Sequence, residues 1–128
     1  MTADGLQDLL RWLLAAVFAG MGILHFMPAV VRTMAAMIPP VLRRPGLPSP
    51  RALVYVTGLC EIAGGVGLLI PGVRLAAGFA LIVFLVAVFP ANAHAAAHPE
   101  RFGRVAVPFW PRFAGQLALV GLVGVALV

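Results

Sequence analysis

The sequence contains no lysine, one cysteine and few charged residues of either sign. Its nine basic residues are all arginines, four residues are acidic, and charged residues account for 10% of the 128 positions. A soluble domain of this size carries about 25% charged residues. This shortage excludes a water-soluble globule, because too little polar surface is available to cover one. Hydrophobic residues make up 62% of the chain, so lipid is the expected solvent for most of it.

Cys60 is the single cysteine, which excludes an internal disulfide and a Cys-x-x-Cys motif. A redox role for Cys60 would require a cysteine of a partner protein, and packing is its simpler role. The net charge of +5 does not indicate nucleic-acid binding, because the arginines lie in the gaps between apolar runs and no basic domain accompanies them. We therefore expect no nucleic-acid partner.

Four apolar runs are long enough, or nearly so, to cross a bilayer, which takes about 20 residues. They cover residues 9–27, 52–70, 75–93 and 109–128. The first run could be read as a signal peptide, but the segment MTADGLQD before it is acidic and no small-residue cleavage site follows. The sequence predicts one all-α transmembrane domain over residues 1–128, an integral membrane four-helix bundle in the lipid bilayer.

The connections between these runs have different lengths. Pro-Gly-Val-Arg at 71–74 predicts a tight helical hairpin, because proline and glycine interrupt helices. In residues 29–38 apolar positions repeat with helical spacing, but this segment is too short to span a membrane. We expect a short interfacial or re-entrant helix there. It should end at Pro39-Pro40, before the proline- and arginine-rich segment that leads into the second run.

Arginines are unevenly distributed between the two ends of the predicted helices. Seven lie at the end with the two long connections, against two at the other end. Because positive residues favour the cytoplasmic side, we expect a multi-pass protein of the cell membrane with the long connections in the cytoplasm and both termini outside. The two groups are Arg32, Arg43, Arg44, Arg51, Arg101, Arg104 and Arg112, and Arg11 with Arg74.

Glu61 is the residue that packing explains least. It lies nine residues into the second run, roughly 13–14 Å deep at 1.5 Å per residue, close to the bilayer midplane. A charge there costs about 2.5–3.5 kcal/mol on insertion scales, so the carboxyl group should be protonated, hydrogen-bonded or paired. Intramembrane ionisable residues are functional candidates, although Glu61 could instead serve as a structural hydrogen-bond donor between helices.

The other polar residues of the runs gather at one end of the predicted bundle. With alternating helix directions, the ends at which they lie all meet on the side of the long connections. We therefore predict a polar pocket between the four helices, open toward the arginine-rich face, with Glu61 and His25 as candidate catalytic residues. The candidate ligand-binding residues are Thr57, Asn92, His94, Arg112 and Gln116. For His25 an interfacial position, and for Gln116 an interhelical hydrogen bond, are the simpler alternatives.

His94 and His98 are spaced four residues apart and would share a helix face only if the third helix continues past Asn92. A transition metal would need a third ligand, and its ligands would need supporting contacts. We expect no metal site, and we disfavour a bound haem.

Glycines should let the helices approach closely, as small residues do in membrane bundles. We assign helix packing to Gly22, Gly58, Gly65 and Gly67. The same is expected of Gly20, Gly64, Gly115, Gly121 and Gly124.

Several short segments occur together in a recognisable order. They are GILHFMP (22–28), TGLCEIAGGVGLLIP (57–71) followed by Arg74 and Ala76, VFPANAH (88–94), and Arg112 with Gln116. As an ordered set over all four runs, they resemble the DoxX-like family of small four-helix bacterial membrane proteins, which implies a location in the bacterial inner membrane. The matched positions are Gly22, His25, Phe26, Pro28, Gly58, Glu61, Gly65, Gly67, Pro90, Asn92, Arg112 and Gln116, and His98 is not among them.

The resemblance implies an association with membrane redox or oxidative-stress systems, since some relatives resemble subunits of quinone-linked sulfur oxidation and others partners of oxidative-stress enzymes. We expect the pocket to bind a small amphiphile such as a quinone, with Glu61 as proton donor or acceptor and His25 as its hydrogen-bond partner. If the protein is an enzyme, it would be a membrane oxidoreductase component with a redox protein as partner. The lack of paired cysteines disfavours a thiol–quinone reductase.

The alternative is a non-catalytic membrane subunit or assembly partner, whose glycine-rich helices dock on another membrane protein. Distant relatives with this helical pattern act as assembly factors. The chain could also form a homo-oligomer. A carrier for a small solute is disfavoured, because the sequence shows neither broken mid-membrane helices nor an inverted repeat.

Overall fold

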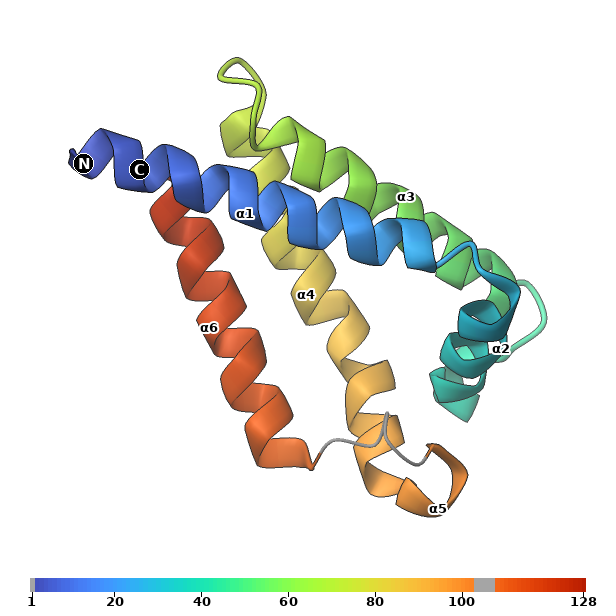
Figure 1. The fold of residues 1–128 in the computed structure, drawn as a ribbon. Helices are drawn as coiled ribbons and strands as arrows, with labels where there is room; N and C mark the ends of the chain where they lie inside the picture. Colours follow the sequence, from blue (N-terminus) through green and yellow to red (C-terminus); the bar gives the residue numbers. More distant parts are fainter. Residues whose placement is uncertain (1, 103–107) are drawn as a thin grey trace.

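The computed structural model describes residues 2–102 and 108–128, which form helices joined by turns and loops (Figure 1). No strand occurs in this part of the chain, so the predicted all-α class is confirmed. The helices are α1 (Ala3–Leu24), α2 (Pro28–Met37), the 3₁₀ helix η1 (Pro40–Leu42), α3 (Pro50–Gly67), α4 (Arg74–Ala97), α5 (Pro99–Phe102) and α6 (Phe109–Leu127).

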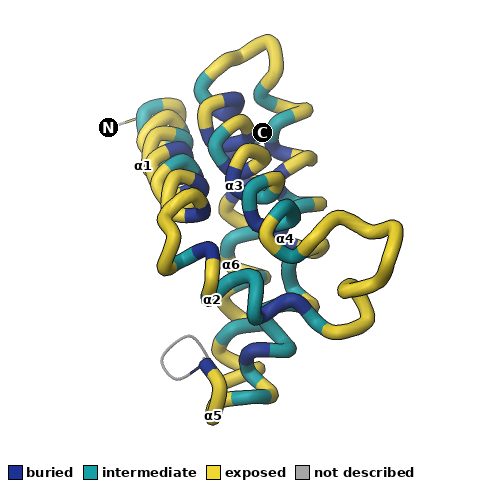
Figure 2. Tube along the Cα trace, turned by 90° about the vertical axis from the view of Figure 1, so that its right-hand side faces the viewer, coloured by how far each residue is buried: buried dark blue, intermediate teal, exposed yellow. Residues whose placement is uncertain are grey.

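Three of the described helices, α1, α4 and α6, are long and apolar enough to cross a bilayer. α3 is not among them, because its 18 residues include Arg51, Glu61 and four glycines, which lower its hydropathy. Figure 2 shows that the outward faces of the helices are largely exposed. Their exposed side chains include large apolar ones such as Val83 and Trp110, which are 67% and 72% exposed. These features are those of a membrane protein.

α1 starts earlier and ends earlier than the first apolar run. It begins at Ala3 because Thr2 caps it, with Thr2 Oγ1 accepting a hydrogen bond from Gly5 N at 3.0 Å. α2 begins at Pro28, and the residue before a proline avoids the helical conformation. Met27 is therefore extended, and α1 ends before it, at Leu24. Hydrophobicity alone marks neither boundary.

The short helix expected at residues 29–38 is present as α2, one residue earlier at each end. The expected hairpin is also present, although α3 ends at Gly67 and the second apolar run continues to residue 70. α4 begins at Arg74 and continues to Ala97, four residues beyond the expected end, with Pro90 inside it.

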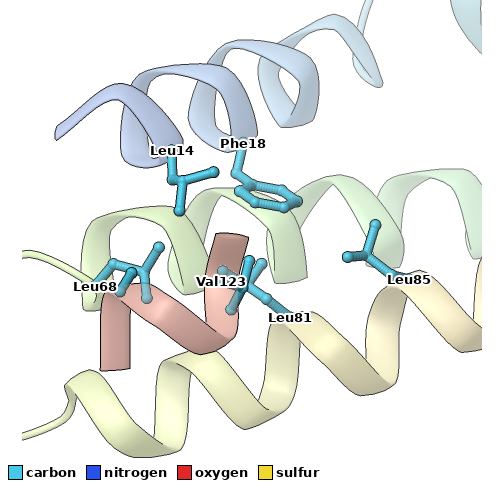
Figure 3. Close-up of a cluster of buried hydrophobic side chains, with 7 residues drawn as sticks. Leu14, Phe18, Leu68, Leu81, Leu85 and Val123 are labelled. Atoms are coloured by element: carbon cyan, nitrogen blue, oxygen red, sulfur yellow. The ribbon is translucent and has the colours of Figure 1, made fainter. Parts of the chain in front are cut away.

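α1 and α3 lie side by side and antiparallel, and α4 and α6 form a second antiparallel pair (Figure 1). The two pairs meet near the α3–α4 turn, which we call the convergent end. They separate toward α2 and α5, which we call the divergent end. The main apolar core lies where the pairs meet (Figure 3). Its buried side chains are Leu14, Phe18, Leu68, Leu81, Leu85, Val123 and Ala126.

Glycines bring α1 and α3 into backbone contact. A Cβ atom added at Gly22 would lie 2.6 Å from Gly58 O, and one added at Gly58 would lie 2.6 Å from His25 Cβ. Gly65 and Gly67 are also crowded, by neighbours on α1 and α4 respectively. Larger residues at these positions would push the helices apart.

The glycines of α6 have a different surrounding. Within the described part of the chain, no atom lies within 4 Å of a Cβ added at Gly115, Gly121 or Gly124, and the same holds for Gly20 of α1. The expectation that these glycines tighten the bundle is wrong, because the space beside them is open.

The two arginines of the convergent end cap helices. Arg11 Nε donates a hydrogen bond to Ala126 O near the end of α6 at 2.8 Å, and Arg11 Nη1 pairs with Asp8 Oδ1 at 2.8 Å. Arg74 Nε donates to Leu68 O, just after α3, at 2.7 Å. Both arginines therefore satisfy carbonyl groups that a helix end leaves without an intrahelical partner.

Candidate functional site

A cavity of about 870 Å³ lies among α2, α3 and α4. Most of its wall is apolar, and polar side chains reach it from three segments of the chain. His25 directly follows α1, Thr57 and Glu61 belong to α3, and Asn92 belongs to α4. The sequence predicted that these four residues share a pocket, and the structure places them around this cavity.

His25 and Glu61 form a buried polar pair in the cavity wall. Each residue is 6% exposed, and His25 Nε2 lies 3.1 Å from Glu61 Oε2. The described residues provide no aligned hydrogen bond to Oε2, so the contact with His25 is what offsets its burial. The pairing expected of Glu61 is therefore observed, and its partner is His25.

Close packing of α1 on α3 places the imidazole. Because Gly58 has no side chain, the backbone at His25 can approach α3 closely enough for the ring to reach Glu61. His25 Nδ1 lies 3.1 Å from Val54 O and 3.2 Å from Thr57 Oγ1. Thr57 Oγ1 itself donates to Val54 O at 2.9 Å.

These contacts assign the protons of the pair. Val54 O can only accept, so His25 Nδ1 carries a hydrogen that it donates to this carbonyl. A proton placed between Nε2 and Glu61 Oε2 would give either a neutral imidazole facing a carboxylic acid or an imidazolium facing a carboxylate. The cavity wall can therefore take up or release a proton at this position.

Asn92 is held from the neighbouring helix. Arg112 Nη1 of α6 donates a hydrogen bond to Asn92 Oδ1 at 3.0 Å. Arg112 does not line the 870 Å³ cavity but a second one of about 420 Å³, and Asn92 lines both. Three methionines also line both cavities, Met21, Met34 and Met37. The single predicted pocket is thus two neighbouring cavities, because α4 and α6 diverge from α1 and α3.

His94 and Gln116 line neither of these two cavities. His94 lies two residues beyond Asn92, about 200° around α4, and its ring packs on that of His98 with the centroids 4.4 Å apart. α4 does continue past Asn92, so the two histidines are neighbours, but on a different side from the cavity. Gln116 is half-buried on α6. The structure does not bring either residue to the pocket expected for it.

Metal ligands are not grouped in the described ranges 2–102 and 108–128. No three or more His, Cys, Asp or Glu side chains lie there in a position to hold a metal ion together. The neighbouring rings of His94 and His98, tilted by 41° to each other, could supply two ligands at most, fewer than a zinc site uses.

The sequence reasoning missed much of the apolar cavity wall. Met34 and Met37 of α2 border the cavity, and the exposed Cys60 lines it beside Glu61. No local sequence signal marks these residues, because the side of a helix that borders a cavity depends on how the helices diverge.

Comparison with curated proteins found no match, and comparison with solved structures found none either. The sequence profile of one family, however, matches residues 14–126. This range begins at the first leucine of the main core and includes every polar residue of both cavities. The chain belongs to this family, which is described as a domain of unknown function, DUF8561.

Proposed function

We propose that the chain is a DoxX-like integral membrane protein with four transmembrane helices, in which α3 is the fourth span. The packing of α3 against both α1 and α4 supports this assignment, as does the short six-residue connection that joins it to α4. Apart from the exposed Arg51 at the start of α3, the residues that lower its hydropathy face neighbouring helices, where small and polar groups are tolerated in membranes. They are the buried residues Gly58, Glu61, Gly64, Gly65 and Gly67.

We place the divergent end on the cytoplasmic side of the bacterial inner membrane, with both termini outside. The arginines of this end are largely exposed, and of these Arg43 donates to Ala35 O and Ile38 O at the end of α2. At the convergent end both arginines, Arg11 and Arg74, donate to helix carbonyls. The charge free to interact with the cytoplasmic leaflet is therefore more one-sided than the arginine count alone indicates. The exposed residues are Arg32, Arg43, Arg44, Arg51 and Arg101.

The proposed function of the large cavity is to bind a small amphiphile such as a quinone, within a membrane redox or oxidative-stress system. The observation that carries this proposal is the His25–Glu61 pair, buried at 3.1 Å in the wall of a mainly apolar cavity. An ionisable pair is costly inside a membrane bundle, and a purely structural hydrogen bond needs no cavity beside it. The apolar wall suits a hydrocarbon tail, and the few polar side chains suit a head group.

In this proposal the pair exchanges a proton with an oxygen of the bound head group. His25 Nδ1 stays hydrogen-bonded to Val54 O, so the mobile proton moves among Nε2, Glu61 Oε2 and the ligand. Reduction of a quinone to a quinol takes two electrons and two protons. A redox protein partner would supply the electrons, and the pair would deliver the protons in turn, regaining each from the cytoplasmic side. The chain would then be the membrane component of an oxidoreductase.

The test is to purify the protein in mild detergent and to identify what it carries, by absorption spectroscopy and by mass spectrometry of the extracted lipophiles. Wild type is expected to retain a quinone-like amphiphile, and Glu61→Leu should lose it. Gln116→Leu changes a polar side chain outside both cavities and should retain it. Wild-type protein that retains no amphiphile and binds no added quinone would contradict the proposal.

A second candidate is a non-catalytic subunit or assembly partner of another membrane protein. The open space beside Gly115, Gly121 and Gly124 favours it, because small residues let a partner helix approach closely. In this case Gly121→Leu should abolish co-purification of a partner, and Glu61→Leu should leave it intact. Cross-linking in the membrane would show whether the partner is another protein or a second copy of this chain.

A further inference from the structure

The contact between Arg112 and Asn92 fixes the direction of the Asn92 amide. A guanidinium group has N–H donors and no acceptor, so the atom that it contacts at 3.0 Å has to be the amide oxygen. The two N–H donors of Asn92 Nδ2 are then turned away from that contact. Asn92 lines the 870 Å³ cavity, and Arg112 does not.

We infer that Arg112 is a positioning residue, which holds Asn92 as a hydrogen-bond donor in the large cavity for an amphiphile whose head group presents a carbonyl oxygen. The inference rests on the proposed function and names the class of ligand. A carbonyl oxygen accepts hydrogen bonds and does not donate them, which matches an amide whose oxygen is engaged by Arg112 and which can offer only its N–H groups. A head group without an acceptor would leave these donors unpaired in an apolar cavity, at a cost to binding.

The remaining wall fits the same ligand. From Asn92 to Ala76 the lining of α4 extends about 24 Å, at 1.5 Å per residue, and the helix between them is apolar. Ala76, Ala80, Val83 and Ala87 in this stretch are exposed, so the cavity opens toward lipid along α4. A hydrocarbon tail can enter from the bilayer there, while the head group lies between the Asn92 amide and the buried histidine–glutamate pair.

The test reverses the hydrogen-bonding character of position 92. Asn92→Asp keeps the contact with Arg112 as an ion pair but presents acceptors in place of donors. Gln116→Glu makes the same amide-to-acid change one helical turn from Arg112 and outside both cavities, so it is the matched control. The probes are a long-chain methyl ketone, which only accepts, and the secondary alcohol of the same length, which accepts and donates. Binding is read as protection of Cys60, the single cysteine and a lining residue, from a lipophilic thiol reagent.

Wild type and Gln116→Glu are expected to bind both probes. Asn92→Asp should weaken ketone binding about tenfold or more and alcohol binding less than about twofold. Arg112→Ala releases the amide to rotate and should weaken ketone binding by a smaller factor, about threefold, which keeps the test open if the acid destabilises the fold.

The inference is overturned if Asn92→Asp and Arg112→Ala both bind the ketone as wild type does. It is also overturned if Asn92→Asp loses the ketone and the alcohol equally, or if wild type binds the alcohol and not the ketone. Each of these results leaves the proposed function standing. A wild type that binds neither probe and no quinone contradicts the proposed function itself.

Discussion

At the convergent end of the bundle, all four long helices pack around a buried apolar core, and arginine side chains cap the ends of α3 and α6. At the divergent end the same helices separate, and polar contacts connect them within each pair. His25 meets Glu61 between α1 and α3, and Asn92 meets Arg112 between α4 and α6. The smaller cavity and the polar part of the larger one lie where the two pairs part, and the apolar wall of the larger cavity continues along α4 to Ala76. Apolar packing at one end therefore joins the pairs firmly enough for the other end to hold ionisable groups beside open space.

The largest effect is expected from breaking the polar pair of the divergent end on one side. His25→Leu leaves the carboxyl of Glu61 buried without its partner and should lower the free energy of unfolding by about 3–5 kcal/mol. The double variant His25→Leu/Glu61→Leu should recover most of that loss, because well-packed apolar residues replace a buried pair at little cost. Thermal denaturation in detergent measures both. If the double variant is as unstable as the single one, the pair serves to hold the bundle together.

At the convergent end, the core rather than a polar contact should carry the stability. Leu81 is 1% exposed, and Leu81→Ala should lower the free energy of unfolding by about 3 kcal/mol through lost burial and a cavity. Val86→Ala, on the same helix and 60% exposed, should change it by less than about 0.5 kcal/mol. Amphiphile binding should survive both substitutions, and its loss in Leu81→Ala alone would show that the two ends are not independent.

A smaller effect is expected along the contact of α1 with α3, which connects the two ends. Gly22→Ala places a Cβ atom 2.6 Å from Gly58 O and should cost about 2 kcal/mol of stability through overpacking. Gly121→Ala meets no atom within 4 Å among the described residues and should be neutral. Equal stability of these two variants in the same denaturation assay would argue against the close approach of α1 and α3.

The smallest effect is expected from the caps. Arg11→Ala removes the hydrogen bond to Ala126 O and the ion pair with Asp8, and should cost about 1 kcal/mol. Arg32→Ala removes an exposed arginine from α2 and is the matched control, with no measurable change expected in the melting temperature. A larger loss in the control would place the stabilising charge at the divergent end.

Local rules explain what the sequence predicted well. The turn between α3 and α4 follows from proline and glycine, and α2 lies within one residue of its expected bounds because prolines flank a segment with helical periodicity. His25, Glu61 and Asn92 could be placed at one end because alternating helices bring alternate chain ends together. Their placement follows from the chain direction of each helix alone, without any knowledge of side-chain contacts.

The remaining features depend on packing that no local pattern contains. A helix that is apolar on most of its surface, such as α6 after Gln116, carries little information on which side faces its neighbours. The rotation of α6 about its own axis decides which of its residues face the bundle, and the divergence of the helix pairs decides which of them reach a cavity. Together they leave Gly121 facing outward and separate Arg112 from the large cavity. The early start of α1 required the cap by Thr2, whereas hydrophobicity rises only later.

The contacts between the start of α1 and the end of α6 also have a consequence for how the protein assembles. Gln7 Nε2 donates to Val125 O at 2.8 Å, beside the contact of Arg11 with Ala126 O. A chain made from its N-terminus inserts α1 before the carbonyl groups that these side chains cap have been synthesised. Arg11 can therefore reach its final position only when α6 arrives, so α1 is made before α6 but is locked in place only after it.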